Sequence, residues 1–293
     1  MREKAVIFGN PKSLVGIVTQ PDFTAGSSGL PAIIILNAGL LHRVGPNRLH
    51  VKMARKLATV GFNVLRFDFS GNGDSNARND NIPFGQSSID EIQDAMNYLS
   101  SSKNISKFIL VGICSGADSA IKTASCDDRV VGAIGINGSY LDSNISKRLI
   151  ADIAGSTQNR YYQNHLFNYK SWWRLITGKS DLNGVIRFMA TQLRKLLTLN
   201  TRSLPKTHIS AITQLLAKIN ADLLIVYSEG SFAFDAFQMI YKKEADALTL
   251  SSKLSIEIIR NSDHVFTLLE SQTALMDLVY QWATDKQRSW LTG

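Results

Sequence analysis

The stretch VGICSGA, at residues 111–117, ends an apolar run and places a cysteine and a serine between two glycines. This pattern predicts a strand that turns sharply into a helix, with a strained backbone at the tip of the turn. The residues two before and two after the tip must be small, because the strand and the helix pass close together there. With Cys114 at the tip these residues are Gly112 and Gly116, whereas Ser115 at the tip would crowd Ile113. The sequence therefore predicts Cys114 as a candidate nucleophile.

Outward from this turn, apolar strands alternate with amphipathic helices. The pattern predicts a hairpin at residues 5–8 and 14–18, and further strands at 32–36, 63–67, 107–112, 130–136, 223–227 and 255–259. It predicts helices at about 48–60, 88–100, 114–125, 235–247 and 267–283. Strands joined through helices of this length form crossover units. We therefore expect an α/β fold with a mostly parallel, eight-stranded sheet and helices on both faces.

Residues 139–208 interrupt this alternation. We expect residues 1–138 and 209–293 to form the core, and 139–208 to form a helical lid inserted into it. This segment holds eleven Lys or Arg and three Asp or Glu, a charge of 11 − 3 = +8, and the remainder of the chain balances at 21 against 21. A local basic excess argues against a nucleic-acid-coating surface and favours one patch for an acidic partner, an anionic substrate or a membrane surface.

Length and composition limit the class of protein. A chain of 293 residues with 44% hydrophobic residues can bury a large core. Its apolar runs are shorter than the roughly 20 residues that span a bilayer, and its first ten residues lack the apolar stretch of a signal peptide, so we expect a cytoplasmic protein without integral membrane association. Cys114 and Cys126 lack metal-binding or disulfide-framework spacing. We expect no metal.

Two further loops at predicted strand ends carry chemically competent side chains. In parallel sheets, reacting groups gather at the carboxyl ends of strands. His264 follows the last strand and is predicted to open the last helix. The loop after the preceding strand offers Asp235 and Glu229 as the acid; we favour Asp235, for which a helix N-cap is the competing interpretation. Asp263 is unlikely to orient the ring of its own neighbour. The chain order is thus nucleophile, acid, histidine.

The electrostatic setting of the turn favours a reactive thiol. A cysteine at a helix N-terminus has its pKa lowered by the helix dipole, and a neighbouring histidine lowers it further. The N–H of Ser115, the first residue of the helix, is placed to stabilise an oxyanion. The competing interpretation is a tight turn that holds a small buried cysteine without chemistry.

The turn SGNGDS, at residues 70–75, looks like a nucleotide-binding loop only superficially. It lacks the third glycine of G-x-G-x-x-G. We interpret it as a structural turn in which Asp68 and Asp74 hold loops, and we expect no cofactor.

At this point the residues carry a family resemblance. The matching stretches are LNAGLLHRVGPNR at 36–48, LRFDFSGNGDS at 65–75, GICSGA at 112–117 and SDHVFT at 262–267. Over essentially its full length the chain resembles an α/β-hydrolase, and within that superfamily it is most similar to serine-aminopeptidase-like hydrolases, particularly the group associated with exosortase A systems. A cysteine nucleophile resembles dienelactone hydrolases and some thioesterases of the superfamily. One departure is Ser231, at the position where many relatives carry their acid.

The resemblance implies a second oxyanion donor in the loop that follows residue 36, and we place it on the N–H of Leu40. It implies that residues 139–208 form a lid over an acyl pocket. We assign substrate binding to Gly39, Leu41, Trp172 and Trp173.

We therefore expect an ester or thioester hydrolase with a Cys114–His264–Asp235 triad and an acyl-enzyme intermediate. Its acyl group would be carried by an acidic acyl carrier protein that docks on the basic lid. Three alternatives stay open: an acyltransferase or cyclase that uses the same acyl-cysteine, a non-catalytic binding module on a hydrolase scaffold, and an interfacial lipid esterase.

Overall fold

The computed structural model describes residues 1–10, 12–22, 29–140, 216, 218–241 and 253–292. Most of the predicted lid, with Trp172 and Trp173, lies outside these residues. No helix within the described ranges is both long and apolar enough to cross a bilayer.

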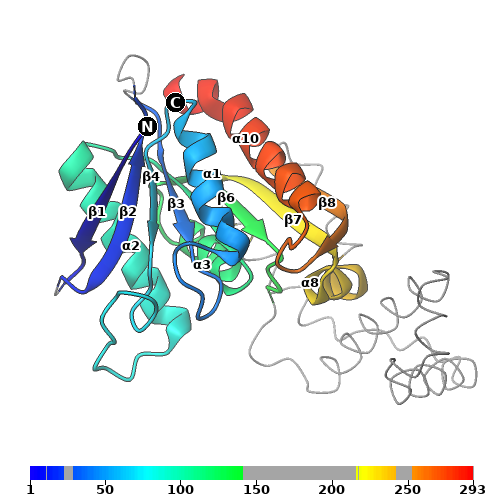
Figure 1. Ribbon diagram of the computed structural model, residues 1–293, viewed down its shortest axis with the longest axis horizontal. Coiled ribbons are helices and arrows are strands. Elements are labelled where there is room, and N and C mark those ends of the chain that lie inside the picture. Colours follow the sequence, from blue (N-terminus) through cyan, green and yellow to red (C-terminus); the bar gives the residue numbers. More distant parts are fainter. Residues whose placement is uncertain (11, 23–28, 141–215, 217, 242–252, 293) are drawn as a thin grey trace, which may run out of the picture.

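Eight strands form one sheet (Figure 1). Their order in space is β1-β2-β4-β3-β5-β6-β7-β8. β1 pairs antiparallel with β2, and β2 with β4, whereas every pair from β4 to β8 is parallel. The predicted hairpin and mostly parallel sheet are confirmed. The strands are β1 (Arg2–Phe8), β2 (Leu14–Gln20), β3 (Ala32–Leu36), β4 (Val64–Phe67), β5 (Phe108–Ile113), β6 (Val130–Ile136), β7 (Asp222–Gly230) and β8 (Leu254–Asp263).

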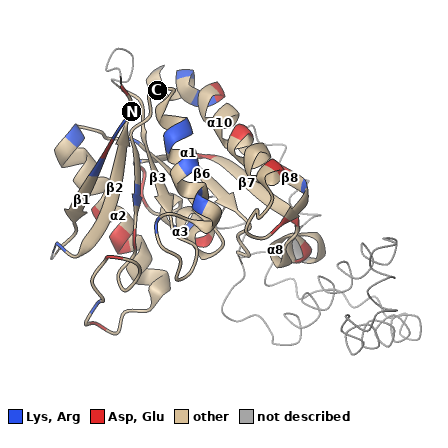
Figure 2. Cartoon of the chain, viewed as in Figure 1, with Lys and Arg blue, Asp and Glu red and all other residues tan. Residues whose placement is uncertain are grey.

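The helices cover both faces of this sheet. α1 (Leu49–Ala58) and α10 (Leu269–Thr292) pack on one face, and α2 (Phe84–Lys103), α3 (Ser115–Ala124) and α8 (Phe232–Ala236) on the other. A short 3-10 helix (Pro46–Arg48) precedes α1, and a π-helical turn (Phe237–Tyr241) follows α8. Lys and Arg stand along α1, whereas α10 carries both signs of charge (Figure 2).

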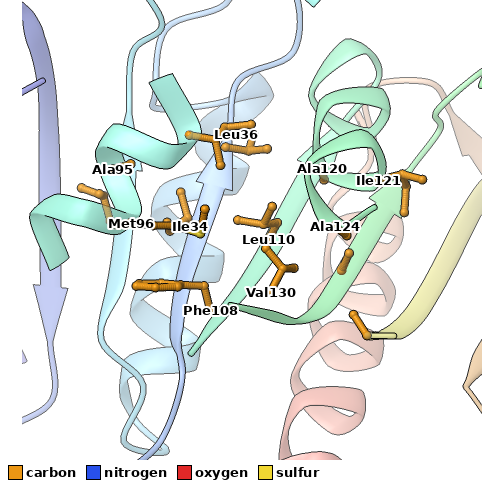
Figure 3. Packing of buried hydrophobic residues seen from close by; sticks show 14 of the residues in the cluster. Ile34, Leu36, Ala95, Met96, Phe108, Leu110, Ala120, Ile121, Ala124 and Val130 are labelled. Carbon is orange, nitrogen blue, oxygen red and sulfur yellow. The ribbon is translucent and has the colours of Figure 1, made fainter. Parts of the chain in front are cut away.

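The central strand β3 shows why the core has two halves. Its sequence AIIIL is entirely buried. Because successive side chains of a strand point to opposite faces, Ile33 and Ile35 pack with α1 and α10, and Ile34 and Leu36 pack with α2 and α3. Figure 3 shows Ile34 and Leu36 near Met96 of α2. Fully burying each such side chain contributes about 1.5–3 kcal/mol, so this strand anchors both layers.

Several predicted boundaries are wrong. β7 and β8 each run three or four residues beyond their expected ends, so Glu229 lies on β7 and not in the loop after it. α8 begins at Phe232, three residues before the expected start, because Ser231 caps it. α10 begins at Leu269, so His264 lies in the connection before this helix and does not open it.

Candidate active site

Cys114 lies at a strained turn between β5 and α3. It has φ 57° and ψ −121°, and it is the N-cap of α3. A non-glycine residue with positive φ is uncommon, and such strain collects at functional sites. Its N–H donates to the carbonyl of Ile136 on β6 (2.8 Å). The strained position predicted from residues 111–117 is therefore the position of Cys114, whereas Ser115 is the first residue of the helix.

The two flanking glycines leave no room for a side chain. A Cβ on Gly112 would lie 2.1 Å from the carbonyl oxygen of Gly116, and a Cβ on Gly116 would lie 2.5 Å from the carbonyl oxygen of Asn37. Both obstructing atoms belong to the backbone, which has little freedom to move away. The turn can therefore form only with glycine at these two positions, as the sequence argument requires.

The loop after β3 reaches the start of α3 through one hydrogen bond. The N–H of Gly39 (φ 53°) donates to Oγ of Ser115 at 2.7 Å. The peptide of Gly39 is held from the other side, because Nδ2 of Asn72 donates to its carbonyl (2.9 Å). Leu40, on which we placed the oxyanion donor, has its side chain 90% exposed. The N–H that the structure brings to Ser115 is thus that of Gly39, one residue earlier.

A buried carboxylate supports this loop. Asp68, fully buried at the end of β4, accepts hydrogen bonds from Nδ2 of Asn37 (3.2 Å) and from the N–H of Arg43 (2.5 Å). The Arg43 guanidinium pairs with Asp68 and with Asp74, and it lowers the pKa of Asp74. The prediction that Asp68 and Asp74 hold loops is confirmed.

The same cluster has the ligand types of a cation site. Potential ligand atoms of His42, Asp68 and Asp74 lie within 4.8 Å of one another. However, the guanidinium of Arg43 already compensates both carboxylates. We therefore assign the cluster to holding the loop rather than to metal binding.

The thiol of Cys114 is half-buried, and its pKa is raised. Burial is the largest cause; the N–H of Ser115 opposes it, and the negative charge of Asp118 adds to it. The expectation of a lowered pKa is therefore wrong: removal of the thiolate from water outweighs the field at the start of α3. In the resting state the sulfur is a protonated thiol that needs a base.

His264 lies directly after β8, half-buried. Burial lowers the pKa of its imidazole, and the charge of Asp263 partly opposes this, so the ring is a neutral base at pH 7. The Asp263 carboxylate accepts from the N–H (2.8 Å) and hydroxyl (2.6 Å) of Thr267, and it therefore shapes the turn before α10. The hydrogen bonds of the described residues include none between the Cys114 thiol and this imidazole. Catalytic contacts in unliganded enzymes often tighten only with substrate.

The two candidate acids have different surroundings. Asp235 is 6% exposed within α8. It is not the N-cap of this helix, because Ser231 is: its Oγ accepts from the N–H of Phe234 (3.1 Å). Glu229, more exposed, accepts from the N–H of Asn261 (3.0 Å) and so ties the end of β7 to β8. Glu229 thus joins β7 to β8. Asp235 is the more deeply buried carboxylate of the two.

Two polar residues of the site escaped the sequence analysis. Asn137, directly after β6, bonds to Ser228 and to His264. Asp118, on α3, accepts from the N–H of Tyr140 (3.0 Å). The only sequence signal for either is a polar residue at the end of a buried strand or one turn into a helix, which is too common to single them out.

Tyr140 marks the point where the chain leaves the described core. Its side chain is half-buried, with a buried hydroxyl, and lies over two glycines: a Cβ on Gly135 would come within 2.0 Å of its hydroxyl, and one on Gly138 within 2.5 Å of the ring. The chain is thus fixed to β6 and to α3 immediately before residue 141.

Apolar side chains stand exposed on the loops that carry Gly39 and His264. They are Leu40 and Leu41 on the first loop, Val265 and Leu268 on the second, and Leu269 at the start of α10. Singly exposed apolar residues are ordinary, but apolar side chains on loops at the carboxyl ends of strands are available to an apolar ligand.

Comparisons with known proteins show what this chain is similar to. The model of the dienelactone hydrolase family matches residues 22–157, which include the loop after β3 and the turn at Cys114. No curated protein matches the chain.

Among solved structures, a dienelactone hydrolase from Anabaena variabilis is 15% identical with a TM-score of 0.56, covering 97% of both chains. A proline iminopeptidase from Mycobacterium smegmatis is 15% identical (TM-score 0.60; 98% of this chain and 99% of that chain). An esterase from Pyrococcus furiosus is 14% identical (TM-score 0.58; 97% and 92%). These likenesses establish the α/β-hydrolase fold. The match to the dienelactone hydrolase family over residues 22–157 supports an ester-hydrolysing enzyme.

Proposed function

We propose that this protein hydrolyses acyl esters or thioesters through a covalent acyl-cysteine. The observation that carries the proposal is the backbone of Cys114: φ 57° at the head of α3, between two glycines that admit no Cβ. A turn of this kind presents a nucleophile at the carboxyl edge of a sheet. A cysteine that only filled the core would not require the strain.

The chemistry follows from the ionisation states. The neutral imidazole of His264 takes the proton from the Cys114 thiol while the sulfur attacks the acyl carbonyl carbon. The carbon–oxygen or carbon–sulfur bond of the substrate then breaks, and the leaving group takes the proton from the imidazolium. In the second half, the imidazole takes a proton from water, which attacks the acyl-cysteine, and the acid and the free thiol are released. Asp235 is our candidate to hold the histidine tautomer, with Glu229 as the alternative.

The oxyanion requires N–H donors at the head of α3. Ser115, as the first helical residue, provides its own N–H. For the second donor the resemblance implies the loop that holds Gly39 and Leu40; the hydrogen bond from Gly39 to Ser115 Oγ favours Gly39. A carbonyl oxygen that displaced the Ser115 hydroxyl would accept this N–H.

The substrate we propose has an apolar acyl group. The exposed leucines beside Gly39 and after His264 support this class. A thioester on an acidic carrier protein would further suit the charge of +8 on residues 139–208. That segment lies almost entirely outside the described residues, so Trp172, Trp173 and the docking of a carrier remain predictions from sequence.

The test is intact-protein mass after incubation with a panel of acyl-pantetheine thioesters and p-nitrophenyl acyl esters. We expect an acyl adduct on the wild type and on Ser115→Ala, and none on Cys114→Ala. His264→Ala should form the adduct far more slowly. An adduct that persists in Cys114→Ala would refute the cysteine mechanism, and no adduct or turnover with any substrate would favour a non-catalytic binding module.

The lifetime of the adduct distinguishes hydrolysis from transfer. A hydrolase loses its acyl group in water alone. An acyltransferase or cyclase keeps it until an amine or alcohol is added, because the same acyl-cysteine then waits for an acceptor other than water.

A further inference from the structure

Asn137 is buried where the ends of three strands meet. It follows β6 directly, has φ 52° and is 1% exposed. Its main-chain N–H donates to the carbonyl of Val226 on β7 (2.8 Å). Asparagine tolerates this left-handed conformation better than most residues, but a buried amide must also satisfy its side-chain hydrogen bonds.

The side chain of Asn137 satisfies them with groups from two other segments. Nδ2 donates to the carbonyl oxygen of His264 (2.9 Å), and Oδ1 accepts from the N–H of Ser228 at the end of β7 (2.7 Å). A carbonyl can only accept and an N–H can only donate, so these two partners fix which way the amide faces. The hydroxyls of Ser228 and Ser231 complete the set, the latter 3.2 Å from Oδ1.

Ile136, the residue before Asn137, connects this amide to Cys114. The carbonyl of Ile136 accepts the N–H of Cys114. Residues 136 and 137 therefore bond, one after the other, to the main chain of Cys114 and to the main chain of His264. This backbone bridge therefore links the main chain of Cys114 to the main chain of His264.

We propose that Asn137 is a positioning residue that sets the distance of His264 from Cys114. The inference rests on the proposed cysteine mechanism. The hydrogen bond of Asn137 to residue 264 is made to the main-chain carbonyl, so it acts on the main chain that carries the imidazole. The hydroxyl of Ser231 bonds to the same amide.

The competing interpretation is that the amide only stabilises the fold. Loss of a buried hydrogen-bond group lowers stability by about 1–3 kcal/mol whatever its role. A positioning role makes a further demand: the influence of His264 on the reactivity of the Cys114 thiol must depend on Asn137.

The experiment measures the rate of Cys114 alkylation by iodoacetamide against pH, in a Cys126→Ser background that removes the second, exposed thiol. Asn137→Gly keeps the positive φ and removes the whole amide. Asn137→Asp keeps an acceptor for Ser228 and loses the donor to His264. Ser228→Ala removes a neighbouring partner and spares the bond to His264. Asn104→Asp is the matched control, because Asn104 has φ 57° at the exposed end of α2.

We expect His264→Ala to move the alkylation profile to higher pH, and both Asn137 variants to move it in the same direction. The Asn137 variants should lower kcat roughly 10- to 100-fold with KM within about threefold, because a misplaced base acts in the transition state. In a His264→Ala background they should add no further shift. Ser228→Ala and Asn104→Asp should keep the wild-type profile.

Two results would overturn the inference in distinguishable ways. If His264→Ala shifts the profile and the folded Asn137 variants do not, Asn137 is structural only and the cysteine mechanism stands. If His264→Ala itself leaves the profile unchanged, the proposed Cys–His mechanism fails and the positioning role fails with it. Should Asn137→Gly not fold, Asn137→Asp carries the test alone.

Discussion

The hydroxyl of Ser115 accepts the main-chain N–H of Gly39 at 2.7 Å. The side chain next to the candidate nucleophile thus occupies a donor that we assign to the oxyanion. Ser115→Ala removes this competitor but keeps the Ser115 N–H. We expect the variant to form the acyl-enzyme with kcat/KM within about threefold of the wild type. A water molecule can accept the Gly39 N–H in place of the serine hydroxyl, and both are neutral acceptors. A loss of 10²-fold or more, measured with a p-nitrophenyl ester, would instead give the hydroxyl a direct part in catalysis.

The close approach of β5 and α3 predicts opposite effects for two glycine-to-alanine changes. Gly112→Ala would bring its Cβ to 2.1 Å from a backbone oxygen, and we expect a loss of roughly 3 kcal/mol or more in the free energy of unfolding, or no folded protein. Gly85→Ala, at the start of α2 with no atom within 4 Å of the added Cβ, should gain about 0.5–1 kcal/mol. Urea denaturation measures both. Equal changes in the unfolding free energies of the two variants would contradict the close approach of β5 and α3 at Gly112.

Asp118 adds negative charge near the thiol and so helps to raise the pKa of Cys114. Asp118→Asn removes the charge and keeps an oxygen to accept the N–H of Tyr140. The pKa of the thiol should fall slightly, and alkylation of Cys114 at pH 7.5 should become about twofold faster. Asp128→Asn, an exposed charge beyond α3, is the control and should leave the rate unchanged. Slower alkylation in Asp118→Asn would contradict this electrostatic account.

The choice of acid is decided by two isosteric variants. Asp235→Asn should lower kcat by about 10- to 100-fold if this buried carboxylate orients His264, and Glu229→Gln should stay within about threefold because its carboxylate binds the Asn261 N–H. Steady-state kinetics of both variants, with melting temperatures to check folding, give the answer. The reverse pattern would make Glu229 the acid.

The lowered pKa of His50 should make the stability of the fold depend on pH, independently of catalysis. Its ring is completely buried on α1, and burial, with the charge of Arg66 second, lowers its pKa to about 4. Between pH 6.5 and 4 the unfolded chain binds a proton that the native state does not, so stability falls as the pH falls. The decrease from this group is about 3 kcal/mol, taken as the pKa change from 6.5 to about 4. His50→Gln should flatten this part of the curve in urea titrations; an unchanged slope would contradict it.

The turn at Cys114 was predictable because it requires residues without a Cβ at positions 112 and 116. Gly112 and Gly116 are visible in the sequence, and the strain at Cys114 follows from the close packing that they permit. The placement of residues 114 and 264 at the same edge of the sheet was predictable as well, because parallel strands bring their carboxyl ends together.

The electrostatics and the finer loop geometry were not predictable. The pKa of Cys114 depends on how much water the packed structure removes, and that is a property of the assembled fold. The hydrogen bond from the Gly39 N–H to Ser115 could not be read from sequence, because Asn72, from another turn, holds the Gly39 carbonyl. The bonds of Asn137 could not be inferred from sequence, because its partners Ser228 and His264 are 91 and 127 positions away in the chain.

The anchoring of Tyr140 has a consequence for protein engineering. The chain reaches residue 141 from a point held by Asp118 on the nucleophile helix and by a ring seated over Gly135. A designer who exchanges the segment that follows for one of another length or composition therefore starts from a fixed attachment. Chimeras joined after Tyr140 should inherit an intact turn at Cys114, because both anchors of Tyr140 lie within the retained part of the chain.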